Sequence, residues 1–306
     1  MNWGEWHENI LIRRVPYFRF YEKLIAKIFY LKWIRKDKPS HVIINFLYHG
    51  ETCLPRDLKY YYILHSPASL IPHRYSYIAE NIRKFNNICG IAVSDFVKSE
   101  AESFFQGNPI EIIYHGVCLN DFKSSVQYYD KPKLKIVTIS ALEKWKGSQD
   151  VIKALSSPGM KEYFEFDIFG EGPYKDELNE LICQLGLDEN ISLKGSIDNV
   201  EDVLPNYDIY CQMSNGEAFG LSLFEAMACG LPTIVYDSPP FDKLIPDQIS
   251  KKIKNKSINE LGATLLKYRD YKERERYGRE AKNFVTENFS VGMMASRYFQ
   301  LFKGSN

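Results

Sequence analysis

The chain has 306 residues, of which 45% are hydrophobic and 25% are charged. This composition is that of a globular protein, so it argues against wholesale disorder, and the length is enough for two domains that each bury a core. Basic and acidic side chains number 39 each, and this zero formal charge, with no recognition motif, argues against a nucleic-acid partner.

The first forty residues depart from this neutrality, because they carry nine basic side chains against four acidic ones. Apolar residues recur at helical spacing over residues 17–33, with lysines between them, which predicts an amphipathic helix. Two roles are open for this helix. It packs its apolar face on the sheet of the first domain, which is the role we favour, or it makes a weak peripheral contact with an anionic membrane.

The cysteines and the apolar segments predict the compartment. The six cysteines form no CxxC pair and no short-range disulfide framework, and several lie in apolar surroundings, as buried free thiols do. The first ten residues contain no apolar core of the signal-peptide type, and no segment approaches the ~20 apolar residues that a membrane span needs. We therefore expect a reduced, cytoplasmic protein, peripheral to a membrane at most. The sequence makes no prediction about the oligomeric state.

In the first part of the chain, short apolar runs alternate with amphipathic stretches. The predicted strands are 41–47, 61–65, 88–94 and 110–116, and the predicted helices are about 75–85 and 95–105. A polar stretch at 118–133 follows and is the expected domain boundary.

The second part of the chain repeats the alternation at shorter spacing. Its predicted strands are 133–140, 164–169, 191–195, 208–213 and 233–236, and its predicted helices lie near 147–156, 174–185 and 199–206 and from about 220. Strands that alternate with helices over this length indicate parallel sheets with helices on both faces. Ligands of such folds bind at the carboxyl ends of the strands.

The stretch GEAFGLSLFEAMACGLPTIV, residues 216–235, predicts a turn and a helix after the strand at 208–213. We expect the helix to begin near Gly220 and to end at Gly230, with Pro232 preventing its continuation. A helix N-terminus carries unpaired amides and partial positive charge, so it can hold a phosphate or a sugar oxygen.

Two carboxylates of this stretch, Glu217 and Glu225, stand eight positions apart. Each can accept hydrogen bonds from vicinal hydroxyls, one from a hexose and the other from a ribose. On two glutamates alone, the better interpretation is a plain turn and helix with solvated carboxylates. The full string of residues favours the binding interpretation.

This string, E-A-F-G-L-S-L-F-E-A-M-A-C-G-L-P, resembles the Glu-x7-Glu signature of retaining GT-B glycosyltransferases, above all glycosyltransferase family four. Further stretches resemble motifs of that family in the family's order: IIYHGVCLNDF (112–122), IVTISALEKWKG (136–147), FDIFGEGPYKDEL (166–178) and ISLKGSI (191–197). The C-terminal NFVTENFSVGMMASRYFQLF resembles the closing helix of the family.

The resemblance implies a GT-B fold, in which two doubly wound, Rossmann-like α/β domains face each other across a cleft. Residues 1–122 would form a shortened, acceptor-side N-terminal domain, completed by a C-terminal helix at 285–306. Residues 123–284 would form the domain that binds the nucleotide-sugar donor.

The resemblance also assigns three catalytic residues. Glu217 would face the donor sugar, Lys146 would contact the diphosphate as a point charge, and His65 would lie near the reacting carbon. For His65, which follows a predicted strand, a packing role without chemistry is equally open.

The other residues that the resemblance implies share a contact with the donor. They are Glu225 for the ribose, Phe219, Gly220 and Leu221 for sugar and phosphate, Gly170 and Gly172 for the approach to the nucleotide, and Gly195, Ser196 and Ile197 around the base. The family's arginine after the first strand of this domain is Ala141 here, preceded by Ser140 in place of glycine. Lys144 is our candidate to substitute for the missing phosphate contact.

The implied reaction moves a hexose, with retention of configuration, from a donor of the GDP-mannose or UDP-glucose type. The acceptor is a glycan, a glycoprotein or a lipid-linked molecule. Neither a cofactor nor a metal ion is expected, and the six histidines form no HxxxH or paired cluster. The alternative is a non-catalytic nucleotide-sugar-binding protein or an accessory subunit, which Ala141 and the short first domain would suit. A dehydrogenase is disfavoured, because Gly170 and Gly172 lack a third glycine of the dinucleotide motif.

Overall fold

The computed structural model describes residues 4–7, 10–13, 41–44, 58–82, 87–122 and 126–303. The predicted helix 17–33 lies outside these residues. The chain divides into two compact units, Met1–Ile112 and Ile113–Asn306.

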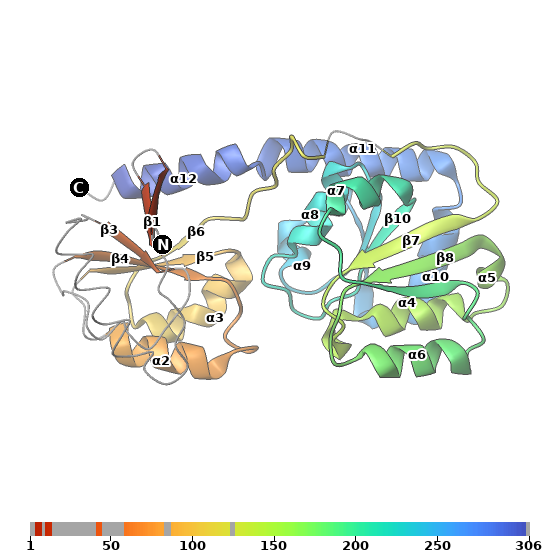
Figure 1. Ribbon diagram of the computed structural model, residues 1–306, viewed down its shortest axis with the longest axis horizontal. Helices are drawn as coiled ribbons and strands as arrows, with labels where there is room; N and C mark the ends of the chain where they lie inside the picture. Colours follow the sequence, from red (N-terminus) through yellow and green to blue (C-terminus); the bar gives the residue numbers. More distant parts are fainter. Residues whose placement is uncertain are drawn as a thin grey trace. The chain divides into compact units, whose positions relative to one another are not determined.

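The first unit contains a four-stranded parallel sheet in the order β3-β4-β5-β6 and a short antiparallel pair, β1 with β2. The strands are β1 (Gly4–His7), β2 (Ile10–Arg13), β3 (His41–Ile44), β4 (Lys59–Leu64), β5 (Ile88–Ala92) and β6 (Ile110–Ile112). The helices α2 (Pro72–Ile82) and α3 (Asp95–Phe105) lie on the same face of the parallel sheet (Figure 1).

Local sequence explains the packing of α3 on this sheet. The Ser94 hydroxyl accepts a hydrogen bond of 3.2 Å from the Val97 amide, so α3 begins with a side-chain cap. A Cβ on Gly90 of β5 would stand 2.8 Å from the ring of Phe105, so the glycine lets the helix approach the strand. The tyrosines of β4 are fully buried.

The second unit is a six-stranded, all-parallel sheet in the order β12-β11-β10-β7-β8-β9. The strands are β7 (Leu134–Ile139), β8 (Phe164–Phe169), β9 (Ile191–Gly195), β10 (Ile209–Gln212), β11 (Thr233–Tyr236) and β12 (Lys251–Ile253). Strand order reverses between β7 and β10, which creates the topological switch point of a doubly wound sheet.

Helices cover both faces of this sheet (Figure 1). The helices of the second unit as a whole are α4 (Ser148–Leu155), α5 (Met160–Tyr163), α6 (Lys175–Gln184), α7 (Val200–Val203), α8 (Leu221–Ala228), α9 (Phe241–Leu244), α10 (Ile258–Lys267), α11 (Tyr271–Asn288) and α12 (Val291–Lys303). Helix α4 packs against α6 and α10, whereas α8 packs against α11. Strands β10 and β11 are buried at every residue, as expected for central strands covered on both sides.

Two predicted elements end differently in the structure. The strand predicted at 110–116 ends at Ile112, because Tyr114 and His115 turn their rings toward Phe219, at centroid distances of 6.2 Å and 5.5 Å. The helix predicted over 285–306 is interrupted, since α11 ends at Asn288 and α12 begins at Val291.

The interruption coincides with a parallel bridge between Val117 and Ser290, in which the Val117 amide donates to the Phe289 carbonyl over 2.7 Å.

The division between the units falls after Ile112, ten residues before the predicted domain boundary at 122. The assignment of the C-terminal helix to the first domain stays a prediction.

Helix α11 is fastened to the second unit by buried polar contacts. The Arg274 guanidinium, 1% exposed, donates to the carbonyls of Tyr268, Arg269 and Tyr129 at 2.5 Å, 3.0 Å and 2.6 Å. The Tyr128 hydroxyl donates to the Gly230 carbonyl beside the helix.

Three of the five described cysteines, Cys89, Cys211 and Cys229, are buried free thiols, as their apolar surroundings predicted. Over the described ranges, no helix combines the length and the apolar character that crossing a membrane requires.

A pair of helical glycines tests this packing. A Cβ on Gly278 of α11 would stand 2.2 Å from both the Gly230 carbonyl oxygen and the Tyr128 hydroxyl, whereas a Cβ on Gly262 of α10 meets nothing within 4 Å. We expect Gly278→Ala to lower the free energy of unfolding by about 1–3 kcal/mol through overpacking. We expect Gly262→Ala to raise it by up to about 1 kcal/mol through helix propensity. Urea unfolding of both variants measures the difference, and equal effects would contradict the packing of α11.

Candidate functional site

The loops that follow β7, β8, β9 and β10 meet at the carboxyl edge of the second sheet, on either side of its switch point. The predicted donor-binding residues of this unit lie on these loops and on the first turns of the helices that follow them. Topology therefore gathers at one edge residues that are far apart in the sequence.

The first three loops are joined by their backbones. The Leu142 amide donates to the Glu171 carbonyl over 3.0 Å, and the Gly170 amide donates to the Gly195 carbonyl over 2.8 Å. Gly170 has φ +136°, and a Cβ there would stand 1.9 Å from the Ser140 carbonyl oxygen. A glycine is thus required at position 170 so that the loop after β8 can approach the loop after β7. The sequence alone did not predict this role.

Lys146 and Glu217 form an ion pair at the centre of this edge. The Lys146 Nζ lies 2.5 Å from Glu217 Oε1, and the two side chains are 14% and 8% exposed. Lys146 ends a short 3₁₀ helix after β7, and Glu217 lies on the loop after β10. Because both charges are withdrawn from water, each needs the other as a partner.

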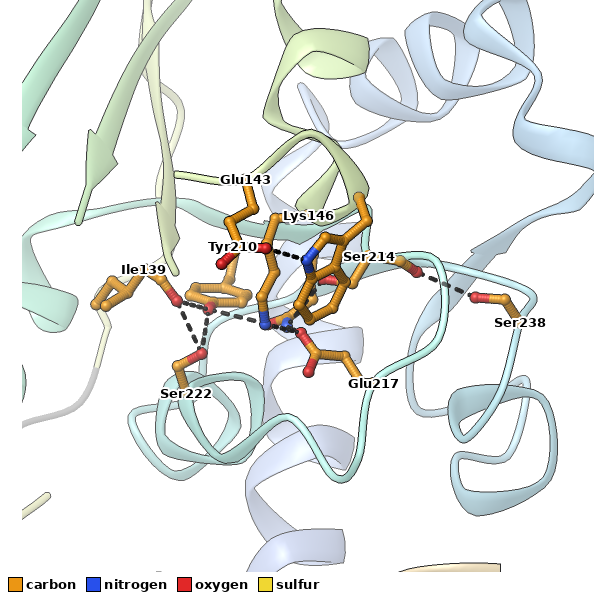
Figure 2. A network of polar contacts seen from close by, with 10 residues as sticks. Ile139, Glu143, Lys146, Tyr210, Ser214, Glu217, Ser222 and Ser238 are labelled. Atoms are coloured by element: carbon orange, nitrogen blue, oxygen red, sulfur yellow. Dashed lines mark hydrogen bonds and ion pairs between the residues drawn. The ribbon is translucent and has the colours of Figure 1, made fainter. Parts of the chain in front are cut away.

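Gln212, the last residue of β10, also binds Glu217, and the sequence prediction missed it. Its Nε2 donates to Glu217 Oε1 over 2.8 Å, and its side chain is fully enclosed. Within the described part of the chain, Glu217 Oε2 accepts no hydrogen bond, and it points away from the network in Figure 2.

Trp145 is a second residue that the prediction missed. Its indole Nε1 donates to Glu143 Oε2 over 2.5 Å, and its ring centroid lies 4.1 Å from the Lys146 Nζ. Its carbonyl accepts from the Asn215 amide over 2.9 Å, which fastens the loop after β7 to the loop after β10. Figure 2 shows Glu143, Lys146 and Glu217 converging from these two loops.

Helix α8 begins at this edge. Its N-cap Gly220 has φ +86° and supplies no side-chain cap, so the first amides of the helix are not bound by a capping side chain. The Phe219 side chain belongs to the core, stacked on Phe224 at 4.4 Å, which leaves only its backbone for a ligand. Leu221 is 41% exposed.

Glu225, one turn into α8, is half-buried. Burial and then the nearby Glu201 carboxylate raise the pKa of Glu225 above its ordinary value of 4.5. No other described side chain donates a hydrogen bond to its carboxylate. A desolvated carboxylate without a donor of its own is a candidate for binding hydroxyls of a ligand.

The remaining predicted residues lie around this centre or in the other unit. Lys144 and Ser196 are exposed, and the Lys144 carbonyl accepts from the Gln149 amide nitrogen over 2.9 Å. The Ser140 hydroxyl oxygen is buried and has no hydrogen-bond partner among the described residues. His65 follows β4 in the first unit, where burial lowers the pKa of its imidazole.

Ala141, in place of the family's arginine, is exposed. Gly172 abuts the loop after β7, because a Cβ on it would stand 2.3 Å from the Leu142 carbonyl oxygen. Ile197, on the loop after β9, is half-buried. Across the described ranges, no group of three or more His, Cys, Asp or Glu side chains could hold a metal ion.

Comparison with known proteins identifies relatives of this chain. The family described as "Glycosyl transferases group 1" matches residues 121–284, more than half of the chain. An uncharacterized glycosyltransferase of Methanocaldococcus jannaschii is 27% identical over 226 residues, which are 70% of this chain and 57% of that protein. The GtfA subunit of a UDP-N-acetylglucosamine–peptide N-acetylglucosaminyltransferase of Streptococcus parasanguinis is 43% identical over 74 residues, 24% of this chain and 14% of that protein.

The matched regions therefore span little more than half of the first relative and a small part of the second. Among solved structures, Anabaena Alr3699/HepE in complex with UDP and glucose has a TM-score of 0.75 at 19% identity, over 94% of this chain and 84% of that chain. At this identity the likeness shows the fold alone, and it confirms the predicted GT-B class of α/β fold with two parallel sheets.

The raised pKa of Glu225 predicts a pH-dependent stability. The folded chain holds this proton more tightly than the unfolded chain, so the free energy of unfolding falls as the pH rises from 4.5 through the raised pKa. We therefore expect Glu225→Gln to be more stable than the wild type above this window and equal to it below pH 4.5. Urea unfolding from pH 4 to pH 8 measures the gap. An offset for Glu225→Gln that stays constant over this pH range would contradict the assignment.

Proposed function

Since the chain belongs to the group 1 glycosyl transferases, we propose that it transfers a hexosyl group from a nucleotide-diphosphate sugar to an acceptor hydroxyl, with retention of configuration. One observation carries the proposal. The Lys146–Glu217 pair is enclosed at the switch point of a doubly wound sheet, and no described residue donates a hydrogen bond to Glu217 Oε2. This arrangement supplies a cation for a diphosphate and an acceptor for a sugar hydroxyl at adjacent positions.

In the proposed reaction, the bond between the anomeric carbon and the phosphate oxygen breaks while the acceptor oxygen attacks from the same face. A donor phosphate oxygen takes the proton of the acceptor. Lys146 keeps one N–H on Glu217 and can direct another to the diphosphate, where negative charge develops. The uncapped first amides of α8, beside Gly220, supply further donors to the same charge.

Glu225 suits the ribose of the donor. Its carboxylate stands in a partly desolvated position on α8, so hydroxyls that donate to it replace water at small cost and gain a charge-assisted hydrogen bond. In the first unit, burial lowers the pKa of His65, so its imidazole is neutral near pH 7 and suits a hydrogen bond with an uncharged hydroxyl.

For the donor we propose a UDP-sugar, UDP-glucose or UDP-N-acetylglucosamine, ahead of GDP-mannose. UDP occurs in the name of the Streptococcus parasanguinis relative and in that of the Anabaena structure. The acceptor that we propose is a hydroxyl of a glycan, a glycoprotein or a lipid-linked molecule.

The two glutamates separate binding from turnover. Calorimetric titration of the whole chain with UDP-glucose, UDP-N-acetylglucosamine and GDP-mannose should give saturable binding of one donor. Glu217→Gln should still bind the free nucleotide but lower turnover by about a hundredfold, because it removes the charge next to the reacting sugar. Glu225→Gln should weaken binding of the free nucleotide itself, and Glu180→Gln, an exposed control, should do neither. A wild-type chain that binds a donor without turning it over would instead indicate a non-catalytic binding or accessory subunit.

The cationic groups named above are all protein groups, so we expect turnover without a divalent metal. Release of nucleotide from the donor should be unchanged within about twofold when 5 mM EDTA replaces about 5 mM MgCl₂, since Lys146 and amides neutralise the leaving group. Recovery of activity only on adding Mg²⁺ or Mn²⁺ would contradict this part of the proposal.

A further inference from the structure

We propose that Gln212 is a positioning residue, which fixes the Glu217 carboxylate so that its Oε2 is presented to the donor sugar. The inference rests on the proposed function. It assigns a role to a buried side chain, Gln212, that the proposed reaction above does not use. Its evidence is the hydrogen-bond network drawn in Figure 2.

The Gln212 amide is engaged at both ends. Its Nε2 lies 2.8 Å from Glu217 Oε1 and 3.3 Å from Ser214 Oγ, and its Oε1 lies 3.1 Å from the Tyr210 hydroxyl. Rotating the amide by half a turn would place its oxygen against a carboxylate and its nitrogen against a hydroxyl donor. The network therefore selects the one orientation in which Gln212 donates to Glu217.

Glu217 Oε1 is held by two donors from different elements. Lys146 reaches it from the 3₁₀ helix after β7, and Gln212 reaches it from the end of β10. Two donors on one oxygen fix the plane of the carboxylate, which a single flexible lysine would not do. The backbone is fixed as well, because the Glu217 amide donates to the Pro239 carbonyl over 3.1 Å.

The far side of the network is anchored to rigid elements. The Tyr210 hydroxyl lies 2.9 Å from Ser222 Oγ on α8, and that oxygen lies 2.9 Å from the Ile139 carbonyl at the end of β7. Gln212 is thus connected, through Tyr210, to both the strand and the helix that border the site. A carboxylate positioned in this way is preorganised before the donor arrives.

Binding measurements on Gln212→Leu test the inference, because Glu217 is proposed to meet the sugar and not the nucleotide. We expect affinity for UDP to change by less than about twofold. We expect affinity for the productive UDP-sugar, UDP-glucose or UDP-N-acetylglucosamine, to fall by on the order of tenfold, the cost of one misdirected hydrogen bond to a charged group. Equal losses for UDP and the UDP-sugar, or no loss for either, would overturn the positioning role.

Thr233→Val is the matched control. Thr233 is buried on the neighbouring strand β11, where its hydroxyl lies 2.8 Å from Ser250 Oγ, so the variant also loses one buried hydrogen bond. It should leave both affinities unchanged. A selective loss of UDP-sugar affinity in Thr233→Val as well would mean that general loosening of the sheet, and not Gln212, explains the effect.

Gln212→Glu provides a second test that keeps the side-chain shape. Three titratable groups of the described residues lie around this position: Lys146 on the 3₁₀ helix, Glu217 on the loop after β10 and Tyr210 on β10. Burial raises the pKa of Tyr210, and the charge of Glu225, on α8, raises it further. A protonated carboxyl can donate to Glu217, whereas an ionised one repels it and competes for Lys146. We expect kcat/KM of Gln212→Glu relative to wild type to fall as the pH rises from 5.5 to 8. A ratio that does not change with pH would overturn the inference.

The two proposals fail in different ways. A wild-type chain that neither binds nor turns over any of the UDP-sugars would contradict the proposed function, and the role of Gln212 with it. A wild-type chain that turns over its donor, while Gln212→Leu does so equally well, would contradict the role of Gln212 alone.

Discussion

A lysine ammonium and a glutamate carboxylate that are both buried need to form an ion pair. Lys146 and Glu217 form one, with 2.5 Å between the Lys146 Nζ and Glu217 Oε1. Breaking such a pair leaves a charge without compensation, so the loops that carry the two residues have to stay in register. The Trp145 carbonyl and the Asn215 amide join the same two loops through the backbone. The ion pair thus depends on the adjacency of β7 and β10, and that adjacency exists only because the strand order reverses there.

Some groups of the site lower the free energy of unfolding. Glu225 has its pKa raised by burial and by Glu201, so its charge opposes folding near neutral pH. The Ser140 hydroxyl, beside the same edge of the sheet, is buried and finds no hydrogen-bond partner in the part of the chain that the structure describes. The rest of the second unit compensates through apolar burial, since β10 and β11 are enclosed at every residue. Polar groups that lower stability and gather at one edge of a sheet are typical of a functional site.

Most of the architecture of the second unit could be predicted, and the failures have physical causes. Strands β8, β9 and β11 of this unit occur at the predicted residues, as does helix α3 of the first unit, because apolar runs and caps specify them locally. The strand predicted at 110–116 is shorter, since Tyr114 and His115 find aromatic partners instead of a neighbouring strand. The stretch from α9 to α10 was not predicted. Most of α11 was also missed, because its sequence is largely polar and the helix is held in place by hydrogen bonds from Arg274 to distant backbone carbonyls.

The sequence by itself determined the family, the alternation of strands and helices, and the spacing that puts Glu217 before a helix and Glu225 inside it. These are local properties, carried by residues within one strand, turn and helix. Only the tertiary structure decided that Lys146 meets Glu217 from 71 positions away, and that Gln212 shares the same carboxylate oxygen. The order of strands in a parallel sheet depends on how the whole chain packs, and no local pattern of side chains encodes which strand ends will be neighbours.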